Sequence, residues 1–267
     1  MVSDTVSSDP RSLMALAVAA AVRAGHLVRE GQSGAAATAT TKSSPTDAVT
    51  AMDRAAEEAI VEVLLAARPR DGIVGEEGGE RGGQSSVRWH VDPIDGTVNY
   101  MYGLPQYAVC IGAEVAGEVV AGAVFAPTLG ALYSAVQGGG AWRNGVALHC
   151  SEQDDLALSL VATGFGYGAR LRAFQGKVAA RMLPLLRDIR RFGSAALDLC
   201  AVAEGTVDGY FEQGLHSWDL AAAGLVAEEA GARVSKLAAP YGGDAVVAAG
   251  SRLHGALEEQ LREAFGV

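Results

Sequence analysis

The chain has 267 residues, of which 49% are hydrophobic and 19% charged, a composition typical of a globular protein rather than a disordered one. Its formal net charge of −10 argues against a nucleic acid or an anionic membrane surface as the main partner. The three cysteines are widely spaced and form no Cys-x-x-Cys pair, so we expect reduced thiols in a cytoplasmic protein rather than disulfides or zinc.

The first half of the chain predicts two helices followed by a sheet. The expected elements are, in order, helices at 11–30 and 48–67, strands at 73–74 and 87–92, and an antiparallel meander of three apolar runs over 107–142. A bland loop, residues 31–41, separates the helices, and a glycine-rich linker, residues 78–83, precedes the second strand. The apolar run 13–22 is too short to span a bilayer. We therefore expect a core helix there, and neither a membrane span nor a signal peptide.

The second half alternates strands with helices instead. The expected strands are at 157–162, 187–191, 207–212 and 245–249, and the expected helices are at 170–183, 195–204, 219–230 and 251–265. An antiparallel first half and an alternating second half predict stacked layers of sheet and helix, a mixed α/β and α+β protein. We expect one domain over residues 1–267, made of an α+β half at about 11–150 and an α/β half at 151–267.

The most informative stretch is the octapeptide 92–99, Asp-Pro-Ile-Asp-Gly-Thr-Val-Asn. It places Asp92 and Asp95 three positions apart and follows them at once with a Gly-Thr pair. Divalent cations prefer an array of oxygen ligands, and a phosphate is bound by free backbone N–H groups. A lone Asp-x-x-Asp is more often a pair of solvated turn residues, so the interpretation depends on Glu76 upstream and Asp219 downstream.

Four carboxylates follow expected strands or loops rather than lying on a continuous polar face: Glu76, Asp92, Asp95 and Asp219. Burying them unpaired would cost several kcal/mol each, and few basic residues are adjacent to these segments. Mg²⁺ ions are the simplest means of neutralising them. The alternative for each residue alone is a local structural role, such as an N-cap at Asp219 for the helix 219–230.

Two glycine-containing segments could bind an anion or a hydroxyl group. Gly96 lets the backbone approach a phosphate closely, and the Thr97 hydroxyl can hold a water or an oxyanion. Gly193-Ser194-Ala195 precedes an expected helix, so its N–H groups could bind a hydroxyl or a phosphate. A plain helix start explains this second segment equally well, so both interpretations stay open.

Taken together and in this order, these segments resemble the signature motifs of the inositol monophosphatase family. The three signature segments are Gly75-Glu76-Glu77, the octapeptide, and Trp218-Asp219-Leu220-Ala221-Ala222. The similarity extends to further places along the chain: Lys42, Ser44-Pro45-Thr46-Asp47, Asp53, Gly193-Ser194-Ala195-Ala196 and Asp208-Gly209-Tyr210-Phe211-Glu212. It covers about residues 11–265, and it is more specific for the superfamily than for the substrate.

The resemblance implies a five-layered αβαβα sandwich of the inositol monophosphatase and fructose-1,6-bisphosphatase superfamily, usually a homodimer. It also implies hydrolysis of phosphate monoesters with two or three Mg²⁺ ions, and inhibition by lithium. A first metal would be held by Glu76, Asp92 and the backbone carbonyl of Ile94. A second would be held by Asp92, Asp95 and Asp219, and Glu76 would orient a looser third ion through water.

The same resemblance assigns the remaining site residues. The implied catalytic residues are Asp53, Glu76 and Thr97. Thr97 and Asp53 would position the attacking water. The implied substrate-binding residues are Asp95, Gly96, Thr97, Gly193, Ser194, Ala195, Glu212 and Asp219. Gly96 and Thr97 would contact the phosphate. Ala195, Glu212 and Asp219 would contact the hydroxyl groups of the alcohol.

The substrate is less sharply indicated than the chemistry. Val98-Asn99 after Gly-Thr, and Glu212 in a Tyr-Phe-Glu segment, resemble the inositol type. We therefore expect an inositol-1-monophosphatase acting on myo-inositol 1-phosphate, with histidinol phosphate and sugar or nucleotide bisphosphates as the alternative substrates. An alternative of another class is a non-catalytic partner of the transcription or ribosome-assembly machinery. The acidic cluster argues against it, since a scaffold need not retain four costly carboxylates.

Overall fold

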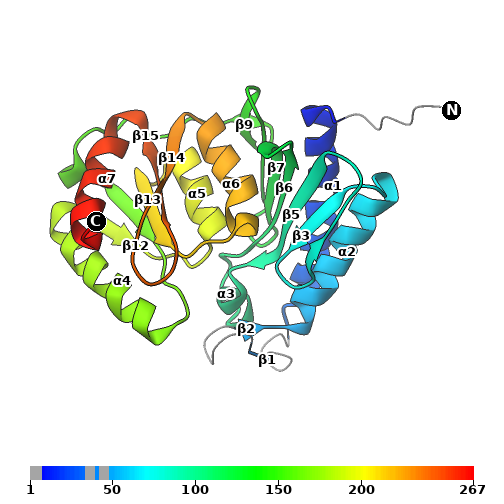
Figure 1. Ribbon diagram of the computed structural model, residues 1–267, viewed down its shortest axis with the longest axis horizontal. Helices are drawn as coiled ribbons and strands as arrows, with labels where there is room; N and C mark the ends of the chain where they lie inside the picture. Colours follow the sequence, from blue (N-terminus) through cyan, green and yellow to red (C-terminus); the bar gives the residue numbers. More distant parts are fainter. Residues whose placement is uncertain (1–7, 34–39, 42–47) are drawn as a thin grey trace.

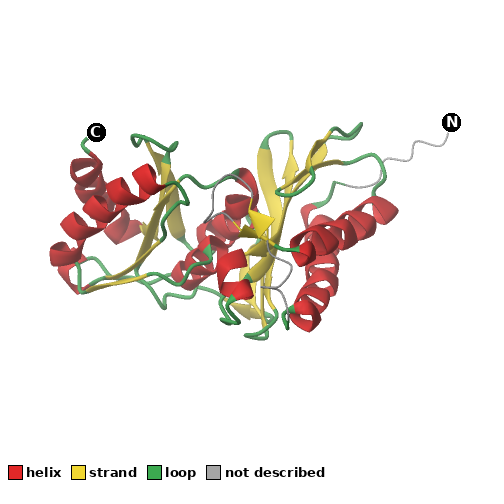
Figure 2. Cartoon of the chain, turned by 90° about the horizontal axis from the view of Figure 1, so that it is seen from below, coloured by secondary structure: helices red, strands yellow, loops and turns green. Residues whose placement is uncertain are grey.

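The computed structural model describes residues 8–33, 40–41 and 48–267. Two main sheets stand side by side, with one layer of helices between them and another on each outer face (Figure 1). Figure 2 shows both sheets edge on, with the outer helices at either end of the molecule. The layer order is therefore helix, sheet, helix, sheet, helix. This arrangement confirms the predicted five-layered αβαβα sandwich.

The larger sheet has eight strands in the order β10-β9-β8-β7-β6-β5-β3-β4. Its strands are β3 (Gly72–Gly75), β4 (Gly79–Arg81), β5 (Val87–Asp95), β6 (Ala108–Val115), β7 (Glu118–Ala126), β8 (Ala131–Val136), β9 (Gly140–Arg143) and β10 (Val146–Ala147). All neighbours pair antiparallel except β3 and β5, which are parallel. The predicted meander is thus confirmed as β6 to β8 and continues into β9 and β10.

The smaller sheet has five strands in the order β12-β11-β13-β15-β14. Its strands are β11 (Leu160–Thr163), β12 (Asp188–Arg190), β13 (Gly209–Gln213), β14 (Ala232–Leu237) and β15 (Ala245–Gly250). The first three are parallel, and β15 pairs antiparallel with both β13 and β14. Short parallel strands with helical crossovers match the predicted alternation of strand and helix in this half.

The helices divide among the three helical layers. Their bounds are α1 (Pro10–Gly31), α2 (Ala51–Ala67), α3 (Thr97–Met101), α4 (Ala169–Met182), α5 (Ala195–Ala203), α6 (Ser217–Glu229) and α7 (Ser251–Phe265), with 3₁₀ turns at Leu156–Leu158 and Leu183–Leu185. α1 and α2 cover the outer face of the large sheet, α4 and α7 cover the outer face of the small sheet, and α5 and α6 pack between the sheets. The central layer therefore connects the two halves.

Helix α1 is long and apolar enough to cross a membrane by length and composition, with a mean hydropathy of 1.3. In the folded chain its small residues instead pack against β6, β7 and α2. Ala17, Ala21 and Ala24 are fully buried, and Gly25 lies so close to the ring of Phe125 that a Cβ there would overlap it. The helix therefore has the packing of a core helix, and it is longer than the apolar run recognised in the sequence.

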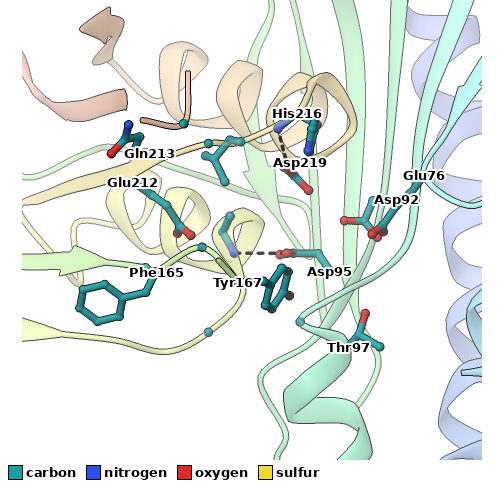
Figure 3. A pocket seen from close by; sticks show the side chains of 18 of the residues that line it. Glu76, Asp92, Asp95, Thr97, Phe165, Tyr167, Glu212, Gln213, His216 and Asp219 are labelled. Carbon is teal, nitrogen blue, oxygen red and sulfur yellow. Dashed lines mark hydrogen bonds between the residues drawn. The ribbon is translucent and has the colours of Figure 1, made fainter. Parts of the chain in front are cut away.

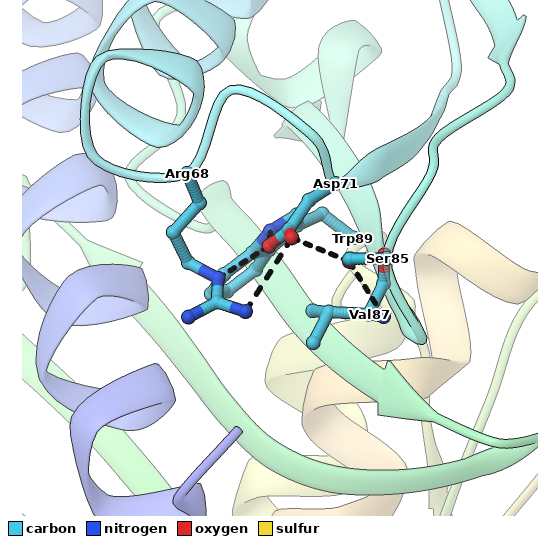
Figure 4. Close-up of polar contacts among 5 residues, drawn as sticks. All are labelled: Arg68, Asp71, Ser85, Val87 and Trp89. Carbon is cyan, nitrogen blue, oxygen red and sulfur yellow. Dashed lines mark hydrogen bonds and ion pairs between the residues drawn. The ribbon is translucent and has the colours of Figure 1, made fainter. Parts of the chain in front are cut away.

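A buried polar cluster joins the end of α2 to the start of the large sheet (Figure 4). Asp71 pairs with Arg68 and also accepts hydrogen bonds from Ser85 Oγ at 2.6 Å and Trp89 Nε1 at 2.9 Å. The carboxylate is 3% exposed, so removing one partner would leave a buried charge unpaired, at a cost of about 3–5 kcal/mol. The cluster fixes the turn from which β3 leads to Glu76.

The structure corrects several predicted element boundaries. Helix α2 begins at Ala51 rather than 48, because Thr50 caps it and residues 48–49 form strand β2. β2 pairs with β1 (Thr40–Thr41), so the end of the predicted loop 31–41 is a strand, whereas residues 34–39 lie outside the described part of the chain. β4 lies inside the predicted linker 78–83, and β14 was not predicted. Both are short edge strands whose residues are largely exposed or half-buried, so they lack a strong apolar pattern.

Candidate metal and phosphate site

A cavity of about 450 Å³ opens beside the octapeptide and takes residues from both halves of the chain (Figure 3). Ten of the twelve predicted site residues line it: Glu76, Asp92, Ile94, Asp95, Gly96, Thr97, Gly193, Ala195, Glu212 and Asp219. The other two, Asp53 and Ser194, are buried directly behind Thr97 and Asp95, to which they are hydrogen-bonded. Residues that are up to 166 positions apart (219 − 53) therefore converge at one place.

The carboxylates of Asp92, Asp95 and Asp219 each bring an oxygen within 4.8 Å of the others, and Glu76 lies next to Asp92 (Figure 3). Burial raises the pKa of Asp92 well above its usual value, and the charges of Glu76, Asp95 and Asp219 raise it further. Burial and neighbouring carboxylates likewise raise the pKa of Asp219. Among the described residues, none of the ion pairs with a basic side chain includes Asp92, Asp95 or Asp219. A cation would relieve this repulsion.

An irregularity in β5 brings Asp92 and Asp95 to the same cavity. Residues three apart in a regular strand point to opposite faces. In β5, Asp92 pairs with Cys110 but Asp95 pairs with Ala108, so three steps on β5 face two steps on β6. The extra residue restores a common direction for the two carboxylates. The strand therefore continues to Asp95, beyond the predicted end at 92.

Asp95 is held by the start of α5. Ser194 donates its hydroxyl hydrogen to the carboxylate, and the backbone N–H groups of Ala195 and Ala196 donate to it at 3.3 and 2.8 Å. Burial is the largest effect and raises the pKa of Asp95, and these three hydrogen bonds partly oppose it. These contacts agree with the helix-start interpretation of the segment 193–195. The N–H group of Ala195 is engaged by Asp95, and Ser194 points to the same carboxylate, so neither offers these donors freely to a ligand.

Thr97 is oriented from behind by Asp53. The Thr97 hydroxyl lies 3.1 Å from Asp53 Oδ1 and 3.0 Å from the Ile94 carbonyl oxygen. A carbonyl oxygen and an ionised carboxylate accept hydrogen bonds and cannot donate them, so the hydroxyl hydrogen is directed to one of these two atoms. The other carboxylate oxygen of Asp53 accepts from Thr50 N at 2.7 Å, which closes the capping box of α2. Thr97 Oγ1 therefore keeps its lone pairs for a donor in the cavity.

Gly96 occupies a position that requires glycine. Its φ of +92° lies in the left-handed region, and a Cβ there would come within 2.9 Å of the Gln106 carbonyl oxygen. Asn99, three residues on, donates hydrogen bonds from Nδ2 to the carbonyl oxygens of Gln106 and Phe192, both at 2.7 Å. The octapeptide is thereby tied to the segment before α5, across the boundary between the two halves.

Comparison with known proteins agrees with this geometry. Residues 9–265 match the model of the inositol monophosphatase family. The chain belongs to this family. It is 47% identical to an inositol-1-monophosphatase of Mycobacterium bovis over 229 residues, which are 82% of this chain and 79% of that protein. It is 41% identical to the Nus factor SuhB of Pasteurella multocida over 224 residues, 83% of this chain and 84% of that protein.

Among solved structures, Mycobacterium tuberculosis SuhB superposes with a TM-score of 0.84 at 40% identity, covering 97% of this chain and 99% of that one. The resemblance inferred from the motifs is therefore confirmed, for a family of metal-dependent phosphatases. Two of its segments, Lys42 and Ser44-Pro45-Thr46-Asp47, lie outside the described residues.

Glu212 faces the acidic cluster from the small sheet. Tyr210 Oη donates to its Oε2 at 2.8 Å, and a Cβ at Gly164 would overlap its carboxylate, so glycine at 164 makes room for it. Burial, opposed by the Tyr210 hydrogen bond, raises the pKa of Glu212 to about 7. A carboxyl group that titrates near neutrality can accept hydrogen bonds from hydroxyl groups when ionised and donate one when protonated.

Two further acidic residues near the site were missed from the sequence. Glu57, on α2, accepts hydrogen bonds from the backbone N–H groups of Glu77 and Gly78 and so holds the loop that carries Glu76. Asp198, on α5, is fully buried and neither of its oxygens has a hydrogen-bond partner. Burial and the charge of Glu212 raise its pKa to about 9. Neither residue lies in a signature segment, so the sequence offered no signal beyond an acidic residue at a buried helical position.

Proposed function

We propose that the protein is a Mg²⁺-dependent phosphate monoester hydrolase, an inositol-1-monophosphatase that releases myo-inositol and phosphate from myo-inositol 1-phosphate. The observation that carries the proposal is the convergence of Glu76, Asp92, Asp95 and Asp219 in one cavity. Burial and the charges of neighbouring carboxylates raise the pKa of both Asp92 and Asp219. A cluster of carboxylates that repel each other is stable only when protons or cations compensate their charge. Because the substrate is itself negatively charged, cations are needed for it to bind beside the cluster.

The donor set fits Mg²⁺. Every candidate ligand is a carboxylate or carbonyl oxygen, the type that this hard cation prefers. Glu76, Asp92 and the Ile94 carbonyl would hold a first ion, Asp92, Asp95 and Asp219 a second, and Glu76 would orient a third through water. Bound ions would supply the positive charge that offsets the phosphate and the developing alkoxide, and would make water more acidic.

The residues of the chain would then orient the reactants. Gly96, in its left-handed conformation, would leave its N–H side open to a phosphate oxygen. Thr97, whose hydroxyl hydrogen is directed to Asp53 or to the Ile94 carbonyl oxygen, would accept a hydrogen bond from the attacking water and so turn a lone pair of that water towards phosphorus. Reaction by positioned water needs no covalent nucleophile, which agrees with the absence of a cysteine from the residues that line the cavity.

Glu212 and Asp219 would select the alcohol. Glu212 reaches the cavity from β13 of the small sheet and Asp219 from α6 in the central helical layer, and both could accept hydrogen bonds from ring hydroxyl groups. Ala195, the first residue of α5, also lines the cavity. A volume of about 450 Å³ suits a ligand of the size of an inositol phosphate. Because the cavity takes residues from about 11–150 and from 151–267, we infer that these halves function as a single domain. The family resemblance further implies a lithium-sensitive homodimer, which we place in the cytoplasm.

Phosphate release from a panel of substrates tests the proposal. The panel contains myo-inositol 1-phosphate, histidinol phosphate, fructose 1,6-bisphosphate and adenosine 3′,5′-bisphosphate, each with Mg²⁺ and with EDTA. We expect Mg²⁺-dependent release, fastest from myo-inositol 1-phosphate. Faster release from another of the four substrates would show that the enzyme belongs to that substrate class instead. Failure to release phosphate from any of the four would contradict the proposed hydrolase activity.

A second candidate function has one observation in its favour, since a relative at 41% identity is named Nus factor SuhB. Under this alternative the chain would act as a partner in transcription, with or without phosphatase activity. Pull-down with the transcription apparatus, using the wild type and Asp95→Asn, separates the two roles. Retention by both proteins would support the partner role, and retention by neither would exclude it.

A further inference from the structure

Helix α6, which carries Asp219, rests directly on the large sheet. A Cβ at Gly112 would come within 2.7 Å of Ala221 Cβ, and a Cβ at Gly122 within 2.9 Å of Ala222 Cα. Gly112 and Gly122 are cross-strand partners on β6 and β7. The two glycines therefore set how closely the helix approaches the sheet, but they cannot fix its rotation or its position along its own axis.

The third member of this cross-strand row is His90, which pairs with Gly112 on β5. Its imidazole is buried, with Nδ1 3.0 Å from Ser217 Oγ and Nε2 2.9 Å from Glu114 Oε2. A carboxylate can only accept, so Nε2 carries a hydrogen, and in the neutral imidazole Nδ1 then accepts from the Ser217 hydroxyl. Ser217 is the first residue of α6, so the bond fixes the N-terminal end of the helix to the sheet.

The two bonded residues stand at matching distances from two of the acidic residues. His90 comes two positions before Asp92 on β5, and Ser217 comes two positions before Asp219 on α6. Asp219 Oδ2 in turn accepts from His216 N at 2.7 Å, so the same short segment also orients the carboxylate. The His90–Ser217 bond therefore links the two chain segments that present Asp92 and Asp219 to the cavity.

We propose that His90 and Ser217 form a positioning pair that holds Asp92 and Asp219 at the separation required for a shared divalent cation, an inference that rests on the proposed function. Like charges in a poorly solvated cluster repel each other, so the metal-free carboxylates tend to separate. A hydrogen bond two residues away on both segments opposes that separation. The pair thus acts through the backbone and does not touch substrate or metal itself.

Binding of Mn²⁺ to the substrate-free protein, followed by electron paramagnetic resonance, tests the pair. We expect Ser217→Ala to weaken Mn²⁺ binding about tenfold, the size typical of lost support to metal ligands. Ser217→Thr keeps a hydroxyl and should bind Mn²⁺ as the wild type does. At saturating Mg²⁺ the Ser217→Ala protein should recover its kcat, because none of the groups that contact the reactants has changed.

Ser235 provides a matched control. Its hydroxyl lies 2.9 Å from His254 Nε2 and 2.9 Å from Glu258 Oε2, the same three residue types, but it joins β14 to α7. Ser235→Ala should leave Mn²⁺ affinity unchanged. Unchanged affinity in Ser217→Ala, an equal loss in both alanine variants, or no rescue by threonine would each overturn the positioning role while leaving the proposed function intact. A wild-type protein that binds no Mn²⁺ would contradict both proposals.

Discussion

Glu57 accepts a hydrogen bond from the backbone N–H of Glu77 at 2.9 Å, although the two residues lie on different elements. A second bond, from Gly78 N at 2.6 Å, binds the other carboxylate oxygen. Gly75 contributes by its lack of a side chain, since a Cβ there would come within 2.7 Å of the Glu57 carboxylate. An acidic side chain that lines no part of the cavity thus fixes the loop on which Glu76 is presented to it.

Replacing Glu57 by glutamine should therefore impair the metal site without removing a ligand. The amide retains one acceptor oxygen but turns an NH₂ group towards a backbone donor, so one of the two loop bonds is lost. We expect the Mg²⁺ concentration for half-maximal phosphate release to rise about tenfold. Glu58→Gln, at the exposed neighbouring position on α2, is the control and should behave as the wild type. An unchanged Mg²⁺ requirement in Glu57→Gln would show that the loop keeps its conformation without the hydrogen bonds to Glu57.

The titration of Glu212 should report on the metal site. In the metal-free protein its pKa is about 7, and the charge of Asp95 is one of the causes that raise it. Mg²⁺ offsets that charge, so adding it should lower the midpoint. Carbon-13 NMR of labelled glutamate carboxyl groups measures this titration, with Glu212→Gln identifying the resonance. A midpoint near the usual value of 4.5 without metal, or no response to Mg²⁺, would contradict the arrangement.

Asp198 should make the folded protein less stable as the pH rises. Its pKa is about 9 in the folded state against a usual 3.8, so between these values the folded state binds a proton that the unfolded state does not. Stability from this group is therefore full below about pH 4 and is lost as the pH increases towards 9. Asp198→Asn removes the titration. We expect its melting temperature to exceed that of the wild type by about 5 °C at pH 8, and by less at pH 5.

Thermal unfolding in EDTA across this pH range checks the prediction. EDTA keeps the metal ligands in the same state in both proteins, so the difference isolates Asp198. A difference in melting temperature that stays constant from pH 5 to pH 8 would mean that Asp198 finds a partner in solution and does not remain a neutral buried acid.

The parts of the site that depend on local sequence could be predicted, and the parts that depend on pairing could not. Asp92, Asp95, Gly96 and Thr97 stand in one octapeptide, so their types and spacing already indicate metal and phosphate chemistry. The irregularity in β5 that turns both aspartates to one side exists only through the register with β6. A sequence read on its own gives no register, which explains why the strand was expected to end at 92.

Supporting contacts were hidden for a similar reason. Glu57 precedes its hydrogen-bond donors by 20 and 21 positions, and Ser194 follows Asp95 by 99. Nothing in the composition around these residues distinguishes them from solvated or capping side chains. The alternation of elements predicted stacked layers of sheet and helix, and the family resemblance of the motifs implied their order. The edge strand β14, with its half-buried pattern, could not be predicted.

The central claim is that the cavity hydrolyses phosphate monoesters through cations held by its carboxylates. The most direct measurement is Mg²⁺-dependent phosphate release from myo-inositol 1-phosphate by the wild type and by Asp95→Asn. Asp95 also accepts hydrogen bonds from the first backbone N–H groups of α5. Asp9→Asn, which removes the charge that caps α1 through Ser12 N, is therefore the matched control for a weakened helix start. Circular dichroism verifies that each variant is folded.

We expect the wild type and Asp9→Asn to release phosphate only with Mg²⁺, and turnover by folded Asp95→Asn to fall at least about 100-fold. Release that persists in EDTA, or normal turnover by Asp95→Asn, would contradict the account.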